Sequence, residues 1–309
     1  MLSLRRKVNG KSESLNVVSF WKRNLTAYLL ILPACAFIFI VLVYPLVYSL
    51  ILSFGSLPSF DQPMEFVGLK NYRGLINQYG FWQTVRQTLV WTTGNVIFQF
   101  LLGLFAALLV NRTRIGKAVG LSILLVPWVS TYVVTAIVWR LIFDSQLGML
   151  NDVLIRLGFI KDALNWLGDP KLAMIAVITA NVWKYYPFNM MLLMGGLQSI
   201  SPALKEAAEI DGANGWQQFS RVTLPLLRPV MFVTVMLNIV HAFNAFTVVH
   251  VMTGGGPLRA TEIFPLLIHR LGFVSLSFER ASAAAGLLFL TVAFAISIYT
   301  WTFWKESEM

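Results

Sequence analysis

Charged residues are scarce in this chain. Asp, Glu, Lys and Arg make up 12% of its 309 residues, whereas hydrophobic residues make up 57%. A soluble domain of this length cannot bury so much apolar side chain, so the composition excludes a soluble globular protein and favours a polytopic membrane protein. The single cysteine, Cys35, lies in an apolar run, so intramolecular disulfides are excluded.

Acidic residues are absent from six long apolar runs, each of which is long enough to cross a membrane. We therefore predict an all-α polytopic membrane protein with six transmembrane helices at about 25–54, 87–110, 118–143, 172–197, 230–252 and 281–304. Proton-coupled carriers usually relay protons through acidic side chains within the membrane, and sodium sites often use them too. The absence of these residues leaves an ion-coupled secondary carrier as the less favoured alternative.

The chain also lacks the sequence signatures of nucleotide and metal sites. No G-x-x-x-x-G-K-[ST] segment is present, and His241, His250 and His269 show no metal-ligand spacing. We therefore predict no catalytic residue, no metal and no cofactor in this chain, and an intramembrane enzyme is disfavoured. If the chain takes part in active transport, the energy must come from a partner.

The formal net charge is +10, and the positions of the basic residues explain it. Bases are dense in residues 1–24 and in the short loop 111–117, beside long apolar runs. This is the pattern of cytoplasmic segments next to membrane helices rather than of a nucleic-acid-binding surface. We predict a cytoplasmic tail at 1–24, a six-span domain in membrane lipid at 25–304, a cytoplasmic tail at 305–309, and no nucleic-acid partner.

The longest polar segment between two apolar runs covers 201–229. Ser201 is a favourable N-cap, Pro202 suits the first helical position, and Gly212 follows a run of helix formers where a left-handed residue belongs. A second short helix is predicted from Gly215, ended by Leu224-Pro225. Six spans place this segment, between spans four and five, on the same side as the N-terminus. A docking surface and a simple spacer both fit these features.

Three motifs resemble bacterial binding-protein-dependent ABC importer permeases of the carbohydrate type, over residues 33–304. Glu206-Ala207-Ala208, Gly212, Val222 and Leu224-Pro225 resemble the EAA loop, in which the family has Ile at the position of Val222. FVGLKNY at 66–72 and TGGGP at 253–257 resemble segments next to the spans. The resemblance implies a cytoplasmic coupling helix whose ATPase-coupling residues are Glu206, Ala207, Ala208, Glu209, Asp211 and Gly212.

The resemblance also implies partners and a location. Such a permease pairs with a second homologous permease subunit, two ABC ATPase subunits that hold ATP and Mg, and an extracytoplasmic solute-binding protein. It lies in the bacterial cytoplasmic (inner) membrane with both termini cytoplasmic, and it imports a sugar or related polyol. A sensor or scaffold permease that binds the ATPase without transport remains a further alternative.

Polar residues gather in two of the predicted spans, at 181–189 and at 238–244. Amides and hydroxyls beside aromatic rings suit a sugar, but such residues also join membrane helices to one another, and both interpretations stay open. The resemblance to maltose-type permeases assigns a substrate path to Asn181, Lys184, Tyr185, Phe188, Asn238, His241, Ala242 and Ala245. Ala242 and Ala245 replace amides of that family, which implies a different substrate or a site shared with the partner permease.

Lys184 leaves the charge of the cargo open. A base in the path favours an anionic cargo such as glycerol-3-phosphate or a uronate oligosaccharide. Alternatively, its ammonium group reaches the interface or binds a carbonyl oxygen, in which case the cargo is neutral.

Overall fold

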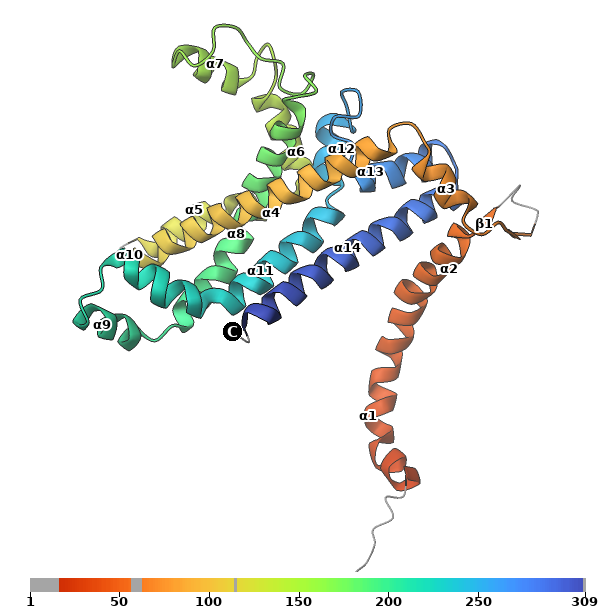
Figure 1. Ribbon diagram of the computed structural model, residues 1–309, viewed down its shortest axis with the longest axis horizontal. Helices are drawn as coiled ribbons and strands as arrows, with labels where there is room; N and C mark the ends of the chain where they lie inside the picture. The colour runs from red at the N-terminus through yellow and green to blue at the C-terminus, as the bar shows by residue number, and fades with distance from the viewer. Residues whose placement is uncertain (1–16, 57–62, 114–115, 308–309) are drawn as a thin grey trace, which may run out of the picture. The chain divides into compact units, whose positions relative to one another are not determined.

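The computed structural model describes residues 17–56, 63–113 and 116–307, which are mainly helical (Figure 1). The chain forms two compact units, 1–51 and 52–309. Helix α1 (Val17–Ile38), the π-helical turn η1 (Phe39–Val43) and α2 (Tyr44–Ser53) follow one another without a break. They contain an apolar stretch, Tyr28–Ser53, that is long enough to cross a membrane.

The π-helical turn η1 ends two residues before Pro45. Proline has no amide hydrogen, and its ring collides with the carbonyl group one turn earlier, so a wide turn at this place lets the helix continue. The residues of η1 are all exposed. This helix therefore presents an apolar surface that suits lipid or another protein chain.

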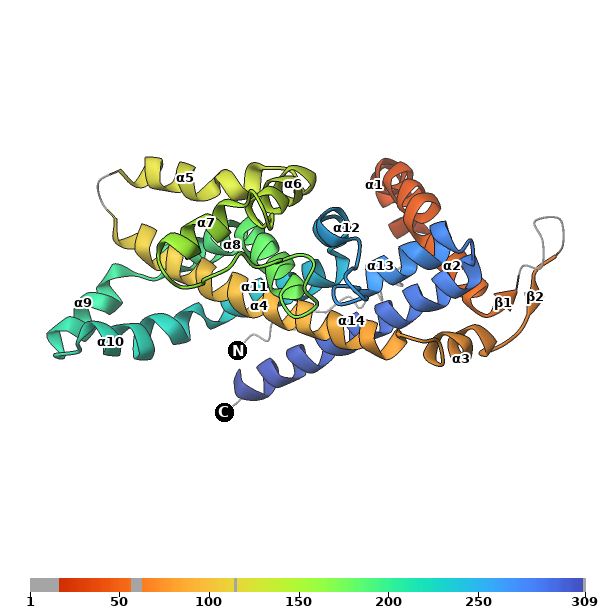
Figure 2. The ribbon, with the colours of Figure 1, turned by 90° about the horizontal axis from the view of Figure 1, so that it is seen from above.

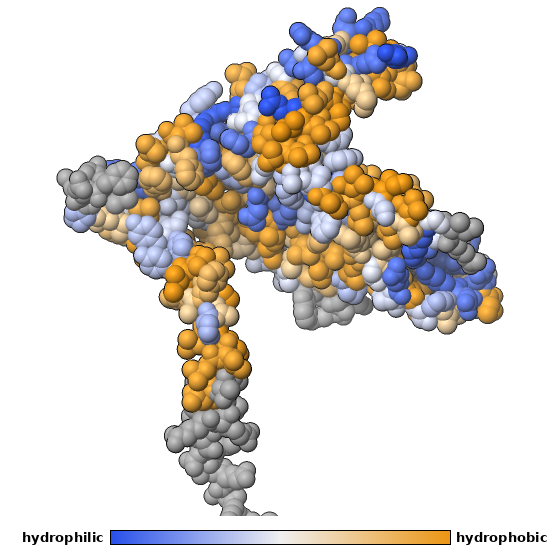
Figure 3. All heavy atoms as spheres, turned by 180° about the vertical axis from the view of Figure 1, so that it is seen from behind, coloured by the Kyte–Doolittle hydropathy of each residue, from blue (hydrophilic) through white to orange (hydrophobic). Residues whose placement is uncertain are grey.

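The second unit begins with a small antiparallel ribbon, in which β1 (Gly55–Ser56) pairs with β2 (Glu65–Phe66). The helices that follow are α3 (Lys70–Ile76), α4 (Phe81–Arg112), α5 (Lys117–Val129), α6 (Tyr132–Ile142), α7 (Met149–Arg156), α8 (Ala173–Ser199), α9 (Pro202–Ile210), α10 (Gly215–Gln218), η2 (Phe219–Thr223), α11 (Leu224–Asn244), α12 (Thr247–Thr253), α13 (Phe264–His269), η3 (Arg270–Val274) and α14 (Phe278–Ser307). Seen from behind, hydrophilic side chains gather around α7 and at the end that carries α9 and α10 (Figure 3).

Residues of the FVGLKNY motif connect the start of α3 to the end of α2 and to β1. The Asn71 side chain donates hydrogen bonds to the carbonyl oxygens of Ser53 (3.0 Å) and Gly55 (2.7 Å). The Tyr72 hydroxyl lies 2.7 Å from the Ser53 hydroxyl, and its ring packs against Phe54. These contacts satisfy backbone groups that α2 leaves open at its end.

Three long helices, α4, α8 and α11, form the centre of the second unit. One apolar cluster joins Trp91 of α4 to the first half of α8 and to α12, and it includes Val177 and Val249. Another joins the last turns of α4 and α8 to the start of α11 through Ala107, Leu197 and Leu227. The two clusters define two ends of the unit, one with α12 and α13 and one with α9 and α10, as Figures 1 and 2 both show.

The six predicted spans correspond to these helices with two differences. The predicted span 118–143 is two helices, α5 and α6, bent by 94°, and the predicted span 230–252 is divided between α11 and α12. Among the described residues, four helices are long and apolar enough to cross a membrane, or five if the bent pair is one span. Helix α8 has 27 residues but is not among them, because polar residues occupy its middle. Six spans therefore remain a prediction.

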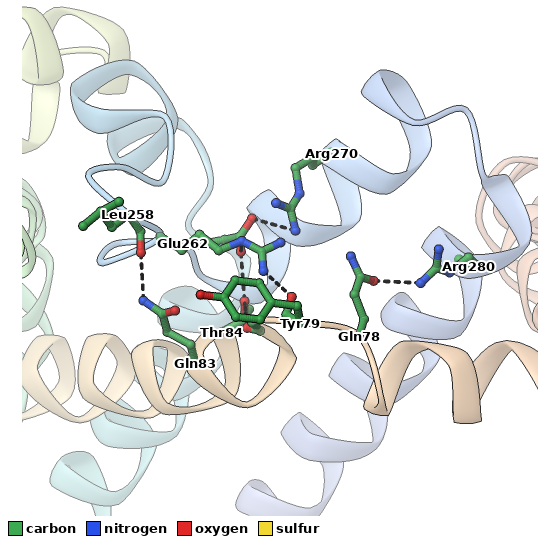
Figure 4. Close-up of polar contacts among 10 residues, drawn as sticks. Gln78, Tyr79, Gln83, Thr84, Leu258, Glu262, Arg270 and Arg280 are labelled. Atoms are coloured by element: carbon green, nitrogen blue, oxygen red, sulfur yellow. Dashed lines mark hydrogen bonds and ion pairs between the residues drawn. The ribbon is translucent and has the colours of Figure 1, made fainter.

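The loop after α12 is fastened to the start of α4 by charge and hydrogen bonds (Figure 4). The buried Glu262 carboxylate pairs with Arg259 and Arg270, each at 3.1 Å, and accepts a hydrogen bond from Thr84 of α4. Arg259 also donates to the Tyr79 carbonyl oxygen, and Gln83 to that of Leu258. The segment after the TGGGP motif is thus held in one position, since a buried carboxylate requires all of these partners.

At Gly103 the backbone of α4 lies close to the backbone of α8. A Cβ atom at Gly103 would lie 2.5 Å from the Cβ atom of Asn189 and 3.0 Å from the backbone nitrogen of Met190. Gly103→Val should therefore destabilise the protein by about 1–3 kcal/mol through overpacking. Gly120→Val is the matched control, because a Cβ atom there meets nothing within 4 Å. Thermal unfolding in detergent measures both, and equal melting temperatures would contradict the prediction.

Candidate functional site

The segment predicted to dock an ATPase folds locally as its sequence predicts. Helix α9 begins at Pro202, and Gly212 after its end has a φ of +81°, which favours glycine. The Ser201 side chain makes no capping bond, whereas Asn214 and Gln217 form a reciprocal capping box at the start of α10. The two short helices α9 and α10 are therefore joined by a turn whose backbone conformation at residue 212 favours glycine.

The second short helix does not end at Leu224-Pro225, contrary to the prediction. Helix α10 continues through η2 into α11, so one helix runs from Gly215 to Asn244. The π-helical turn ends two residues before Pro225, the same arrangement as at Pro45. A proline that would otherwise stop a helix is accommodated by the wide turn before it.

The surface of α9 is not covered by this chain. None of its residues is buried, and the predicted coupling residues Glu206, Ala207, Glu209, Asp211 and Gly212 are exposed, while Ala208 is half-buried. Two large apolar side chains in this segment are also exposed, Ile210 by 86% and Trp216 by 73%. Apolar side chains flanked by acidic ones at the tip of a loop are typical of a surface that another protein covers.

A second candidate site lies where α6, α8 and α11 meet. The rings of Tyr185 and His241 stack with centroids 3.6 Å apart, and the Tyr132 hydroxyl lies 2.8 Å from Nε2 of His241. Beside them is a cavity of about 190 Å³ lined by Tyr132, His241, Asn244, Ala245, Phe246, Thr247 and Val248. The structure thus brings Tyr185, His241 and Ala245 together, as the resemblance implies.

Further aromatic rings pack on one side of the Tyr185–His241 stack. Phe188 packs against Tyr185 and against Trp128. Lys184 is buried, and its ammonium group donates to the Trp128 carbonyl oxygen at 2.6 Å and lies over the Tyr132 ring. Its charge is therefore directed into the helix contact between α5, α6 and α8.

Three of the predicted path residues are buried behind the cavity. The Asn181 side chain donates to Oδ1 of Asn95 at 2.6 Å, and the Ala242 carbonyl oxygen accepts from the Trp91 indole at 3.0 Å. Asn238 is buried, and its two side-chain polar atoms have no hydrogen-bond partner within the part of the chain that the structure describes. The contact of Asn181 favours the alternative in which amides join the helices, whereas Asn238 makes no such contact within the described residues.

Helix α4 contributes a row of buried polar residues that the sequence analysis missed. Thr84, Thr88, Thr92, Asn95 and Gln99 lie on one face, and Gln99 donates to Asn95 Oδ1 and to the Asn181 carbonyl oxygen. The signal was present, because residues three or four apart share a helix face. The sequence signal for this row is weaker than the signal for the polar residues of α8. Threonine is common in membrane helices, and the five residues are spread along α4.

The comparisons with known proteins place these helices in a family. Residues 99–304 match the family described as "Binding-protein-dependent transport system inner membrane component". The chain belongs to this family. As an inner membrane component of such a transport system, it is a permease and not itself an enzyme.

Two curated permeases and one solved structure are similar over most of the chain. The trehalose/maltose transport system permease protein MalF of Thermococcus litoralis is 36% identical over 240 residues, 78% of this chain and 81% of that protein. The sn-glycerol-3-phosphate transport system permease protein UgpA of Yersinia pestis is 34% identical over 266 residues, 86% of this chain and 89% of that protein.

The solved structure is a bacterial alginate ABC transporter in complex with an alginate pentasaccharide-bound periplasmic protein, with 22% identity and a TM-score of 0.80. The match covers 92% of this chain and 95% of that chain. The predicted all-α permease fold is thereby confirmed, with α8, α9 and α11 inside the family match. The roles of individual residues in these helices stay predictions.

Asn95 should be structural, and Asn244 should not. Asn95→Leu removes the oxygen that accepts from Asn181 and Gln99, which should cost about 1–3 kcal/mol of stability because buried donors lose their partner. Asn244 is exposed and bonds only within its own helix turn, so Asn244→Leu should stay within about 0.5 kcal/mol. The melting temperatures of the two variants in detergent test this prediction. If Asn95→Leu melted at the same temperature as the unaltered permease, Asn95 would have no structural role.

Proposed function

We propose that this permease is the membrane-spanning subunit of an ABC importer that moves a sugar or related polyol into the cytoplasm. The observation that carries the proposal is the stack of Tyr185 on His241 beside the cavity, with the Tyr132 hydroxyl on the imidazole. Flat rings pack on the C–H faces of a sugar, while imidazole nitrogens, hydroxyls and amides exchange hydrogen bonds with its hydroxyl groups.

The surroundings of Lys184 support a neutral cargo. Its ammonium group is buried and donates to the Trp128 carbonyl oxygen, and Lys184 is not among the residues that line the cavity, so it offers no direct contact to an anionic group there. The similar proteins are named for both kinds of cargo, trehalose or maltose in one case and glycerol-3-phosphate or alginate in others. An anionic cargo such as glycerol-3-phosphate or a uronate oligosaccharide is therefore the second candidate.

The proposed assembly has a second homologous permease subunit, two ABC ATPase subunits that bind ATP and Mg, and an extracytoplasmic solute-binding protein. Three features of this chain support it: the exposed apolar side chains of η1, the exposed helix α9, and the family's description as binding-protein-dependent. No nucleotide motif lies in the sequence, so hydrolysis belongs to the partners.

We also propose that both termini and α9 face the cytoplasm. The last turn of α4, which leads into the basic loop 111–117, packs beside the end of α8 and the start of α11. The basic loop therefore lies at the same end as α9, and basic loops mark the cytoplasmic side. In transport, a rigid-body movement of the ATPase subunits would be transmitted through α9 and turn the cavity from one side to the other.

The cargo proposal predicts an effect of Tyr185. In proteoliposomes with the complete transporter, Tyr185→Leu should raise the apparent KM for the imported sugar about tenfold, since a stacking contact is lost. Tyr186→Leu is the control, because the Tyr186 side chain lines a separate apolar groove with Phe98 and Trp139. A panel of labelled trehalose, maltose and glycerol-3-phosphate identifies the class. Uptake of glycerol-3-phosphate alone would reject the neutral-sugar proposal.

The docking proposal predicts an effect of Gly212. Gly212→Val places a β-branched residue at a φ of +81°, at a cost of about 1–2 kcal/mol, and should weaken ATPase association about tenfold by displacing α9. Gly215→Val is the matched control, since its φ is not positive and a Cβ atom at either position meets nothing within 4 Å. Co-purification of the ATPase subunits measures both, and equal association would argue against docking at α9.

A further inference from the structure

We infer that this permease has a second, outer sugar subsite, formed by Phe246, His250, His269 and Phe273. The inference rests on the proposed function and extends it. The first subsite is the Tyr185–His241 stack, which would hold one sugar ring. The second would hold the next ring of the same di- or oligosaccharide, on the side of the cavity that faces away from α9.

The four rings of the second subsite form a continuous series. Phe246 stacks on His250 with centroids 4.7 Å apart, and each of these two rings lies 5.1 Å from His269. His269 in turn lies 5.3 Å from Phe273. Phe246 and His250 come from the start of α12 and the residue before it, and His269 and Phe273 from the continuous helix α13–η3, so two segments converge on one aromatic surface. His250 and Phe273 are exposed at its edge, which leaves the surface open to a ligand.

Phe246 also connects this surface to the first subsite. A cavity of about 280 Å³ is lined by Phe243, Asn244, Phe246, Pro265, Ile268, His269, Phe273 and Leu288. The cavity of about 190 Å³ beside His241 shares Asn244 and Phe246 with it. Pockets for drug-sized ligands measure roughly 300–1,000 Å³, so each of these cavities suits one sugar ring rather than an entire oligosaccharide.

The break between α11 and α12 produces this arrangement. Ala245 is extended, with a ψ of 103°, and α12 starts only at Thr247. The backbone therefore leaves the helix at Ala245 and enters α12 at Thr247, and the Phe246 ring between them lines both cavities. The sequence predicts an unbroken helix over 230–252. In such a helix Phe246 would follow Ala245 with regular helical geometry, and the backbone would have no break beside the two cavities.

The chemistry of the surface favours a neutral sugar. Arg270 follows His269 directly, but its guanidinium pairs with the buried Glu262 at 3.1 Å. No charged side chain lines either cavity among the described residues. Imidazole and amide groups remain to exchange hydrogen bonds with hydroxyl groups, and the rings of Phe246, His269 and Phe273 line the cavity for stacking. Several neighbouring rings without a charged side chain are suited to binding a chain of uncharged pyranose units.

The fastening of the loop after α12 supports a binding role for this surface. Glu262 holds Arg259 and Arg270, and Thr84 joins this group to α4 (Figure 4). Phe264 at the start of α13 donates its amide to the Thr88 hydroxyl at 3.0 Å. Two sides of the aromatic surface are thus held against α4, which keeps the rings in position before a ligand arrives.

Binding of sugars of different length tests the inference. The complete transporter without its binding protein, in nanodiscs, is titrated with glucose, maltose, trehalose and maltotriose by calorimetry. His269→Gln and Phe273→Leu, at residues that line only the cavity of about 280 Å³, should weaken maltose, trehalose and maltotriose about tenfold and leave glucose within about twofold. Phe273→Tyr, which keeps the ring, should retain the original affinities. Phe294→Ala removes an exposed ring of α14 that lines neither cavity and should change nothing.

The outcomes separate the two proposals. If Tyr185→Leu weakens every sugar but His269→Gln and Phe273→Leu weaken none, the outer subsite is wrong and the sugar importer stands. Equal weakening of glucose and maltotriose by Phe273→Leu would assign the ring to the first subsite and also reject the second. If no sugar binds the transporter and none is taken up into proteoliposomes, both proposals fail together.

Discussion

The hydrogen bond from Asn181 to Asn95 is the contact on which the arrangement of the central helices depends. It joins α8 to α4 at 2.6 Å in surroundings that offer these amides no water, and Gln99 completes the same group. Because a buried amide without a partner is costly, α8 has one favoured rotation about its axis. That rotation turns Asn181 toward α4 and consequently turns Tyr185 toward His241. The glycine at 103 then allows the close approach that the hydrogen bond requires.

The polar groups of the membrane segments therefore divide into two classes with different tasks. Amides that face other helices, such as Asn95 and Asn181, hold the helices together. Rings such as His241 and Phe246 line cavities, and Tyr185 stacks on His241. Lys184 belongs with the first class, because its ammonium group ends on a carbonyl oxygen. In the proposed function a sugar would therefore meet mainly rings, with the amides holding the helices behind them.

Composition and spacing predicted the helical membrane fold and the two short helices around Gly212, since these follow from local rules for apolar runs, caps and prolines. They could not predict the 94° bend between α5 and α6 or the break at Phe246, because both depend on contacts between distant helices. The prediction that Leu224-Pro225 ends a helix was wrong, since the π-helical turn before Pro225 is not visible in a sequence. Likewise, the sequence does not reveal which neighbouring helix a polar residue in a span faces. For this reason it could not show that Asn181 bonds to another helix whereas Tyr185 stacks on His241.

The continuous helix from Gly215 to Asn244 has a mechanical consequence. Its last 21 residues, helix α11, rise about 1.5 Å each and span roughly 32 Å from the π-helical turn η2 to the turn that carries His241. A tilt of one degree about the first turn of α11 displaces its far end by about 0.55 Å. A small angular change beside the exposed α9–α10 segment thus becomes a change of distance at the Tyr185–His241 stack.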